Sequence, residues 1–140
     1  MAQLKLSRFL NASRARVFAA WTKPNTLGKW FVPGGTVQTK VDLDFRVGGH
    51  YTFSFDNRTV QGTFQEIVPD EYLVFTWQWI GDDVLSVVTI HLSDEQHGTR
   101  LELSHQKLAS DASRANHLIG WESSLDQLET YLGLAQAMDA

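Results

Sequence analysis

The sequence predicts a single α+β domain in which a twisted antiparallel sheet is covered on one face by a long helix. Three observations lead to this prediction. From residue 36 to about residue 108 apolar and polar residues alternate with period two, and a turn signal interrupts them about every ten residues. Two short stretches with helical spacing precede this region, and a longer helical stripe follows it. The expected order is therefore one strand, two short helices, about six strands and one long helix.

Length and composition agree with one domain spanning residues 1–140. Hydrophobic residues make up 43% of the chain and charged residues 20%, which is ordinary for a globular domain and excludes extended disorder. The chain holds no cysteine, so disulfides and thiolate metal sites are excluded. The net charge of −4 argues against broad binding of a nucleic-acid backbone. With no signal peptide and no membrane span recognised, we expect a cytoplasmic protein.

The N-terminal region is expected to form a strand followed by two short helices. Residues 3–10 alternate, which predicts the strand. Ser13 is placed to cap a helix whose apolar residues, within 17–21, follow at helical spacing. Pro24 suits the first turn of the second helix, which should end before the turn at residues 33–35.

The central region is expected to form the meander, with Val37, Thr39 and Val41 in its first strand. The turns between its strands are expected at residues 46–49, 56–58, 69–71, 81–83 and 96–98. Asp42, Arg46 and His50 are expected to form a surface ion pair that steadies the first hairpin.

The last element is expected to be a long helix capped by Asp111 or Ser113. Its apolar stripe, with steps of three and four residues, is Leu118, Trp121, Leu125, Leu128 and Leu132. Gly133 is a plausible stop, and residues 134–140 are expected to form a disordered tail.

One register of the strands should face the helix and enclose a space that is either packed solid or hollow. The five Trp, eight Phe and three Tyr point to a dense core or a ring-lined cavity. An apolar wall with a few polar groups is the general form of a small-molecule site. The candidate ligand-binding residues are Tyr51, Phe53, Phe55, Phe64, Glu66, Phe75, Trp77, Trp79, Ser86, Val88, Thr99, Leu101, Leu103, His105, Trp121 and Leu125.

Seven segments carry a resemblance to a known family. They are RARVFAAWT from residue 14, LGKWF from 27, DLDFRVGGHY from 42, EIVP from 66, GTRL from 98, LSH from 103 and GWESSLDQL from 120. In order and spacing they resemble the heat-shock ATPase activator homologue family of the START-like, or SRPBCC, superfamily. The resemblance implies a helix-grip fold and a hydrophobic cavity between the sheet and the long helix. The eponymous activators carry an additional chaperone-docking domain, which we do not expect in this chain.

Three functions follow from these observations. The first is binding of a small hydrophobic or aromatic ligand between the sheet and the last helix. The second is a cofactor-free cyclase-like or hydrolase-like enzyme in which Glu66 and His105 act as acid and base. In the structural alternative, Glu66 reaches solvent at a strand end and His105 is a hydrogen-bonded core histidine. The third function is interaction with a chaperone ATPase.

Metals and other cofactors are not expected. The five histidines lie on different expected elements and lack the spacing of metal ligands. Both a monomer and a homodimer are compatible with the sequence.

Overall fold

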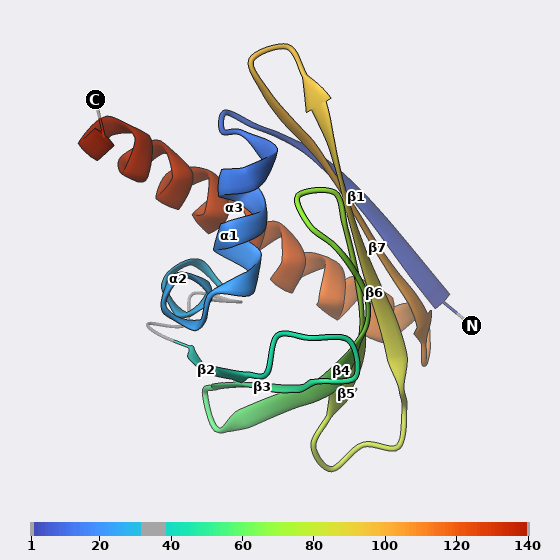
Figure 1. Ribbon diagram of the computed structural model, residues 1–140. Helices are drawn as coiled ribbons and strands as arrows, with labels where there is room; N and C mark the ends of the chain where they lie inside the picture. The colour runs from blue at the N-terminus through green and yellow to red at the C-terminus, as the bar shows by residue number, and fades with distance from the viewer. Residues whose placement is uncertain (1, 32–38, 140) are drawn as a thin grey trace.

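The computed structural model describes residues 2–31 and 39–139 and gives the expected order of elements (Figure 1). The elements are β1 (Ala2–Leu10), α1 (Arg14–Thr22), α2 (Pro24–Trp30), β2 (Lys40–Leu43), β3 (His50–Phe55), β4 (Arg58–Val68), β5 (Tyr72–Trp79), β6 (Ser86–Glu95), β7 (Gly98–Leu108) and α3 (Asp111–Asp139). The expected first strand of the meander begins at Lys40, and Val37 lies outside the described residues.

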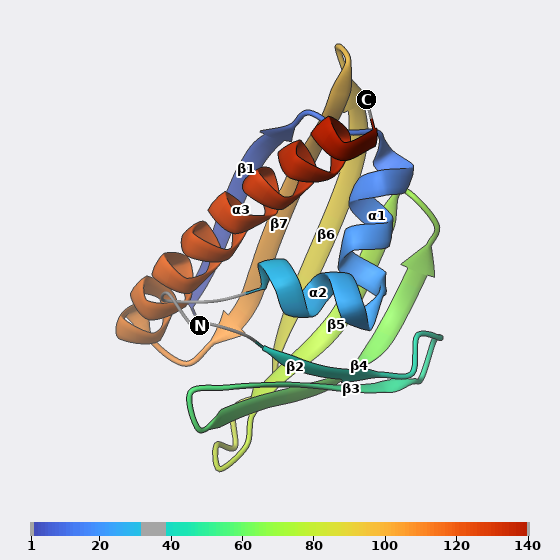
Figure 2. The ribbon, with the colours of Figure 1, turned by 90° about the vertical axis from the view of Figure 1, so that its left-hand side faces the viewer.

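Within the described residues, seven strands form one antiparallel sheet in the order β1-β7-β6-β5-β4-β3-β2. Strands β2 to β7 are the predicted meander, in which each strand pairs with the next. Strand β1 returns to pair with β7, with Leu6 opposite Leu103. The sheet curves strongly, so that β2 and β3 turn away from the plane of β1 and β7 (Figure 2).

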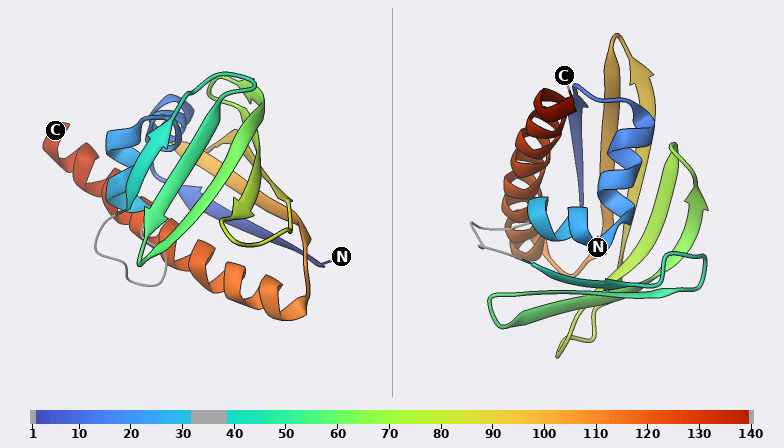
Figure 3. Two further views of the ribbon diagram at one scale, coloured as in Figure 1. Left: turned by 90° about the horizontal axis from the view of Figure 1, so that it is seen from below. Right: turned by 60° about the vertical axis from the view of Figure 1, so that its left-hand side comes forward.

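Helix α3 lies across the inner face of this curved sheet, beside β1 and β7 (Figure 3). Helices α1 and α2 pack on each other, and α2 also contacts both β2 and α3. The short helices therefore close the space between the long helix and the far edge of the sheet. This arrangement confirms the helix-grip fold.

Serine side chains cap the beginnings of two helices. Ser13 caps α1, because its Oγ accepts a hydrogen bond from the backbone N–H of Arg16 at 3.2 Å. The cap of α3 differs from the prediction: Ser110 Oγ accepts from the N–H of Ser113 at 3.1 Å. The predicted stop at Gly133 is wrong, since α3 continues to Asp139. One helical glycine costs only about 1 kcal/mol, and the leucine, alanine, glutamine and methionine residues that follow are good helix formers.

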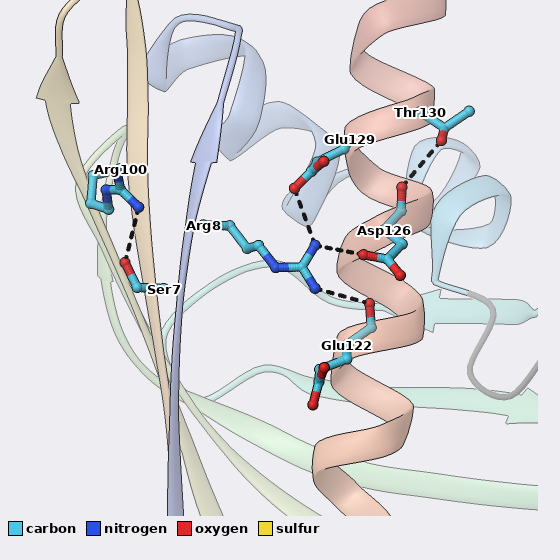
Figure 4. A network of polar contacts seen from close by, with 7 residues as sticks. All are labelled: Ser7, Arg8, Arg100, Glu122, Asp126, Glu129 and Thr130. Carbon is cyan, nitrogen blue, oxygen red and sulfur yellow. Dashed lines mark hydrogen bonds and ion pairs between the residues drawn. The ribbon is translucent and has the colours of Figure 1, made fainter.

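An arginine of the inward register ties α3 to the edge strand (Figure 4). The guanidinium of Arg8 on β1 donates to the carboxylates of Asp126 at 2.7 Å and Glu129 at 3.1 Å, and to the carbonyl of Glu122 at 3.4 Å. These acceptors lie on successive turns of α3, so one side chain contacts two turns of the helix.

The predicted ion pair of the first hairpin forms with a different partner. Arg46 Nε lies 2.7 Å from the Oδ2 atom of Asp44. Asp42 lies in the β2 ladder opposite Thr52, whereas Asp44 belongs to the same turn as Arg46. The turn therefore selects the nearer carboxylate, and the expected pairing of Asp42, Arg46 and His50 is wrong.

Aromatic rings fill most of the space between the sheet and the helices. The ring of Trp77 lies 5.2 Å from that of Trp121 on α3 and 6.1 Å from that of Phe31 after α2. At the end closed by the short helices, the rings of Trp21 and Trp30 are 4.7 Å apart. The surplus of aromatic residues is thus a continuous packed layer, in which edge-to-face contacts are common.

One glycine allows this layer to pack against the sheet. A Cβ added at Gly62 on β4 would lie 2.0 Å from the carbonyl oxygen of Thr76 and 2.7 Å from the ring of Tyr51. The phenol ring of Tyr51 therefore crosses the sheet over Gly62, where its hydroxyl donates to the Thr76 carbonyl.

Candidate functional site

A small pocket remains where the ring layer meets solvent. Its volume is about 100 Å³, and it lies between the strands β3 to β5 and helix α3. Its lining residues are Phe31, Phe55, Arg58, Trp77, Trp79, Asn116, His117, Gly120 and Trp121. Five of these carry large aromatic rings, and the polar groups among them are an arginine, an asparagine and a histidine.

The β3–β4 turn positions two of the lining residues. Asp56 and Asn57 both have positive φ angles, 48° and 62°, as a two-residue type I′ hairpin turn requires. Asparagine and aspartate tolerate this conformation better than other non-glycine residues. The turn places Phe55 directly opposite Arg58. The Arg58 guanidinium carbon then lies 4.0 Å from the centroid of the Trp79 ring, in a cation–π contact.

Helix α3 contributes the opposite wall. His117, Gly120 and Trp121 have the i, i+3 and i+4 spacing of residues that share one helix face. The indole N–H of Trp79 donates to Nε2 of His117 at 3.0 Å. Because Nε2 is an acceptor, the proton of the neutral ring resides on Nδ1, which donates to the carbonyl of Ser113 at 2.7 Å. His117 thus joins the wall on β5 to the wall on α3.

A second histidine lies deeper, in a chain of hydrogen bonds that ends on the backbone. The indole N–H of Trp121 donates to Nδ1 of His105 at 3.1 Å. The imidazole proton must therefore be on Nε2, which donates to Ser86 Oγ at 2.7 Å. Ser86 in turn donates to the carbonyl of Trp77 at 3.0 Å. In this series, the indole N–H of Trp121, both ring nitrogens of His105 and the hydroxyl of Ser86 all have hydrogen-bond partners.

Both histidines are neutral at pH 7. Burial, together with the nearby His117, lowers the pKa of His105 from 6.5 to about 3. The pKa of His117 is also lowered, chiefly by burial; the hydrogen bond to Ser113 opposes this effect, and the charge of Arg58 adds a smaller lowering. The two rings lie 5.0 Å apart, so protonation of either one disfavours protonation of the other.

Glu66 lies outside this site. The prediction placed it in the inward register, but β4 has a register shift between Phe64 and Glu66. A bulge reverses the alternation that follows it. Ile67 consequently packs against the core, and Glu66 is exposed. The structure therefore leaves the Glu66 side chain exposed to solvent, whereas His105, its expected partner, is buried.

Four of the candidate residues line the pocket, namely Phe55, Trp77, Trp79 and Trp121. Ser86 and His105 lie in the hydrogen-bonded chain described above. Thr99 is buried and donates to the carbonyl of Ala12 at 2.7 Å. The other candidates of the inward register are buried in the core: Tyr51, Phe53, Phe64, Phe75, Val88, Leu101, Leu103 and Leu125.

Sequence reasoning missed five lining residues: Phe31, Arg58, Asn116, His117 and Gly120. A signal existed for two of them, because His117 lies four residues before Trp121 on a predicted helix, and Gly120 lies three residues after His117. Arg58 shares the register of Val60 and Phe64, but it was assigned to the expected turn at residues 56–58 rather than to a strand.

The comparisons with known proteins agree with this architecture. The model of the family described as activator of Hsp90 ATPase homolog 1-like protein matches residues 11–133. The chain belongs to this family. The predicted resemblance is therefore confirmed, and the fold is that of a ligand-binding type of domain. No curated protein sequence matches the chain significantly.

Several solved structures are similar to the structure of this chain. Protein CV1439 from Chromobacterium violaceum is 30% identical, with a TM-score of 0.82, and the match covers 93% of this chain and 96% of that one. CalU16 from Micromonospora echinospora is 26% identical, with a TM-score of 0.76 and coverage of 97% and 79%. DynU16, from the dynemicin biosynthetic locus, shares the fold at 19% identity, with a TM-score of 0.82 and coverage of 94% and 47%.

Two further observations concern the described part of the chain. None of its helices is long and apolar enough to cross a membrane. Residues 2–31 and 39–139 contain no cluster of three histidine or carboxylate side chains that could hold a metal ion.

Proposed function

We propose that this member of the activator-homolog family binds a small aromatic or apolar molecule in the pocket between β3–β5 and α3. The observation that carries the proposal is the arrangement of the lining: Trp77, Trp79 and Trp121 form apolar walls, while Arg58 and His117 contribute polar atoms. Apolar walls with a few polar groups are typical of small-molecule sites.

The size of the pocket limits the ligand. A closed apolar cavity of about 150 Å³ accepts one benzene ring. At about 100 Å³ with access to solvent, this pocket suits a single ring whose substituent stays near the opening. A larger ligand would require the ring layer to rearrange, which dense packing makes costly.

The geometry supports binding rather than acid–base catalysis. Both nitrogens of His105 and both nitrogens of His117 already have hydrogen-bond partners within the protein. A general base needs a free lone pair within hydrogen-bond reach of its substrate. Glu66, the other half of the expected catalytic pair, is exposed to solvent.

A titration with toluene tests the proposal. We expect saturable shifts of the indole N–H NMR signals of Trp77, Trp79 and Trp121. The indole N–H of Trp30, which donates to the Ala20 carbonyl at 2.8 Å, should stay unchanged. The melting temperature should rise with toluene concentration, as it does for any ligand that binds only the folded state.

Gly120→Leu provides the matched test of location, because it adds a side chain to the pocket wall. Gly133→Leu is its control: it makes the same change on the same helix, where an added Cβ meets no atom within 4 Å. We expect Gly120→Leu to abolish the toluene shifts and Gly133→Leu to keep them. Equal toluene binding by the two variants would refute this location.

Interaction with a chaperone ATPase remains a separate prediction, since the family is described by an ATPase activator. Stimulation of a purified chaperone's ATPase rate by the wild-type chain is the measurement that tests it.

A further inference from the structure

We propose that the preferred ligand of this pocket is an aromatic carboxylate whose anionic group pairs with Arg58. This inference rests on the proposed function, because it assigns the chemical class of the ligand to the same pocket. It adds a specificity-determining residue to a site whose walls alone would accept any small apolar ring.

The charges around the pocket favour an anion. Among the described residues that line the pocket, Arg58 is the only one with a formal charge at pH 7, and none of them carries a carboxylate. His117 is neutral, because its Nε2 atom accepts a hydrogen bond from the Trp79 indole N–H and burial lowers its pKa. The pocket therefore presents one positive charge at its exposed end, beside an apolar wall. A hydrogen-bonded pair with this charge would strengthen the binding of an anion.

The geometry of Arg58 favours a planar anion. Its guanidinium lies over the ring of Trp79, and Trp79 is itself held by His117. A stacked guanidinium has already lost part of its rotamer freedom, so less entropy is lost when it binds. Its parallel N–H groups match the two oxygens of a carboxylate, which a hydroxyl or an amide cannot reproduce.

The positions of the walls and of the charge also match one ligand shape. The rings of Trp77 and Trp121 are packed together in the layer, whereas Arg58 is exposed at the end of the β3–β4 turn. A ring held against the indoles would thus carry its carboxylate toward the opening. Asp56 of the same turn lines a separate hollow, and Lys40 and Arg58 also line that hollow. This carboxylate is not part of the pocket's own wall.

Benzoate and benzyl alcohol are the probes, because they have nearly the same size and differ in charge. Dissociation constants are measured by NMR titration of the wild type, Arg58→Gln and Arg46→Gln. Arg46 is the matched control, since it is an exposed arginine after another strand, paired with Asp44. All three proteins should first give the same melting temperature within a few degrees.

We expect the wild type to bind benzoate about tenfold or more tightly than benzyl alcohol, which is typical of one charge-assisted hydrogen-bonded pair. Arg58→Gln should remove this preference, because it should weaken the binding of benzoate far more than that of benzyl alcohol. Arg46→Gln should retain the preference. Added salt should weaken the binding of benzoate only.

The outcomes separate the two proposals. If benzyl alcohol binds as tightly as benzoate, or if Arg58→Gln keeps the preference, the assignment of the anion is wrong while the pocket still binds ligands. If the wild type binds neither probe nor toluene, the proposed function itself is wrong.

Discussion

Protonation of His105 is the step through which acid should destabilise this domain. The ring is fully buried, accepts the Trp121 N–H at 3.1 Å and donates to Ser86 at 2.7 Å, an arrangement that requires the neutral form. Its pKa falls from 6.5 to about 3 on folding, chiefly through burial. Between these values the unfolded chain binds a proton that the folded chain excludes. The contribution of His105 to the free energy of unfolding is therefore fully present above pH 6.5 and decreases as the pH falls.

The size of the effect follows from the proton affinity of the two states. Well below pH 6.5, each pH unit favours the unfolded state by about 1.4 kcal/mol. At pH 6.5 only about half of the unfolded chains carry the proton, so the change from pH 6.5 to pH 4.5 lowers the free energy of unfolding by about 2 kcal/mol through this residue. Exclusion of a proton by His117, whose pKa is also lowered, acts in the same direction. Urea unfolding followed by tryptophan fluorescence at a series of pH values measures the total.

The variant His105→Gln isolates the contribution of this histidine. At pH 7 it should be less stable, because Trp121 and Ser86 lose well-placed partners at a cost of about 1–3 kcal/mol each. Its stability should nevertheless depend less on pH than that of the wild type between pH 6.5 and 4.5. His97→Gln, which removes an exposed histidine of the β6–β7 turn, is the control. A pH profile of His105→Gln parallel to that of the wild type would refute the reasoning.

Three further substitutions test the fold by urea unfolding. Ser13→Ala should cost about 1 kcal/mol, because α1 loses its capping hydrogen bond; an unchanged midpoint would show that the cap is dispensable. Gly62→Ala should cost more than about 3 kcal/mol, since its Cβ would lie 2.0 Å from the Thr76 carbonyl oxygen, and a stable variant would contradict this close approach. Arg8→Gln should lower the free energy of unfolding by about 1 kcal/mol or less, because its partner Asp126 is largely exposed. In high salt the difference in stability between this variant and the wild type should be smaller.

Much of the fold follows from short-range patterns. The alternation of residues 98–108 and the turn at residues 96–98 are local properties of the chain, and the structure places β7 and its turn there. The cap at Ser13 is equally local. These predictions succeed because strand alternation, turn chemistry and helix capping depend on residues within a few positions of each other.

The candidate site depends more on tertiary structure. The alternation on β4 placed Glu66 beside the inward rings, but a single bulge after Phe64 turns its carboxylate to solvent. His105 was expected as a candidate base, and its neutral form is set by Trp121 and Ser86, which lie 16 and 19 residues away. Neither the bulge nor these partners can be found from period-two alternation.

The sequence by itself determined that a meander and one long helix would enclose a layer rich in aromatic rings. Only the tertiary structure decided where that layer contains a pocket. Curvature of the sheet brings the turn before Arg58 to the helix face that carries His117, and the two meet through Trp79. The physical reason is that alternation specifies which face of a strand is apolar, whereas twist, bulges and helix docking specify which residues of that face finally meet.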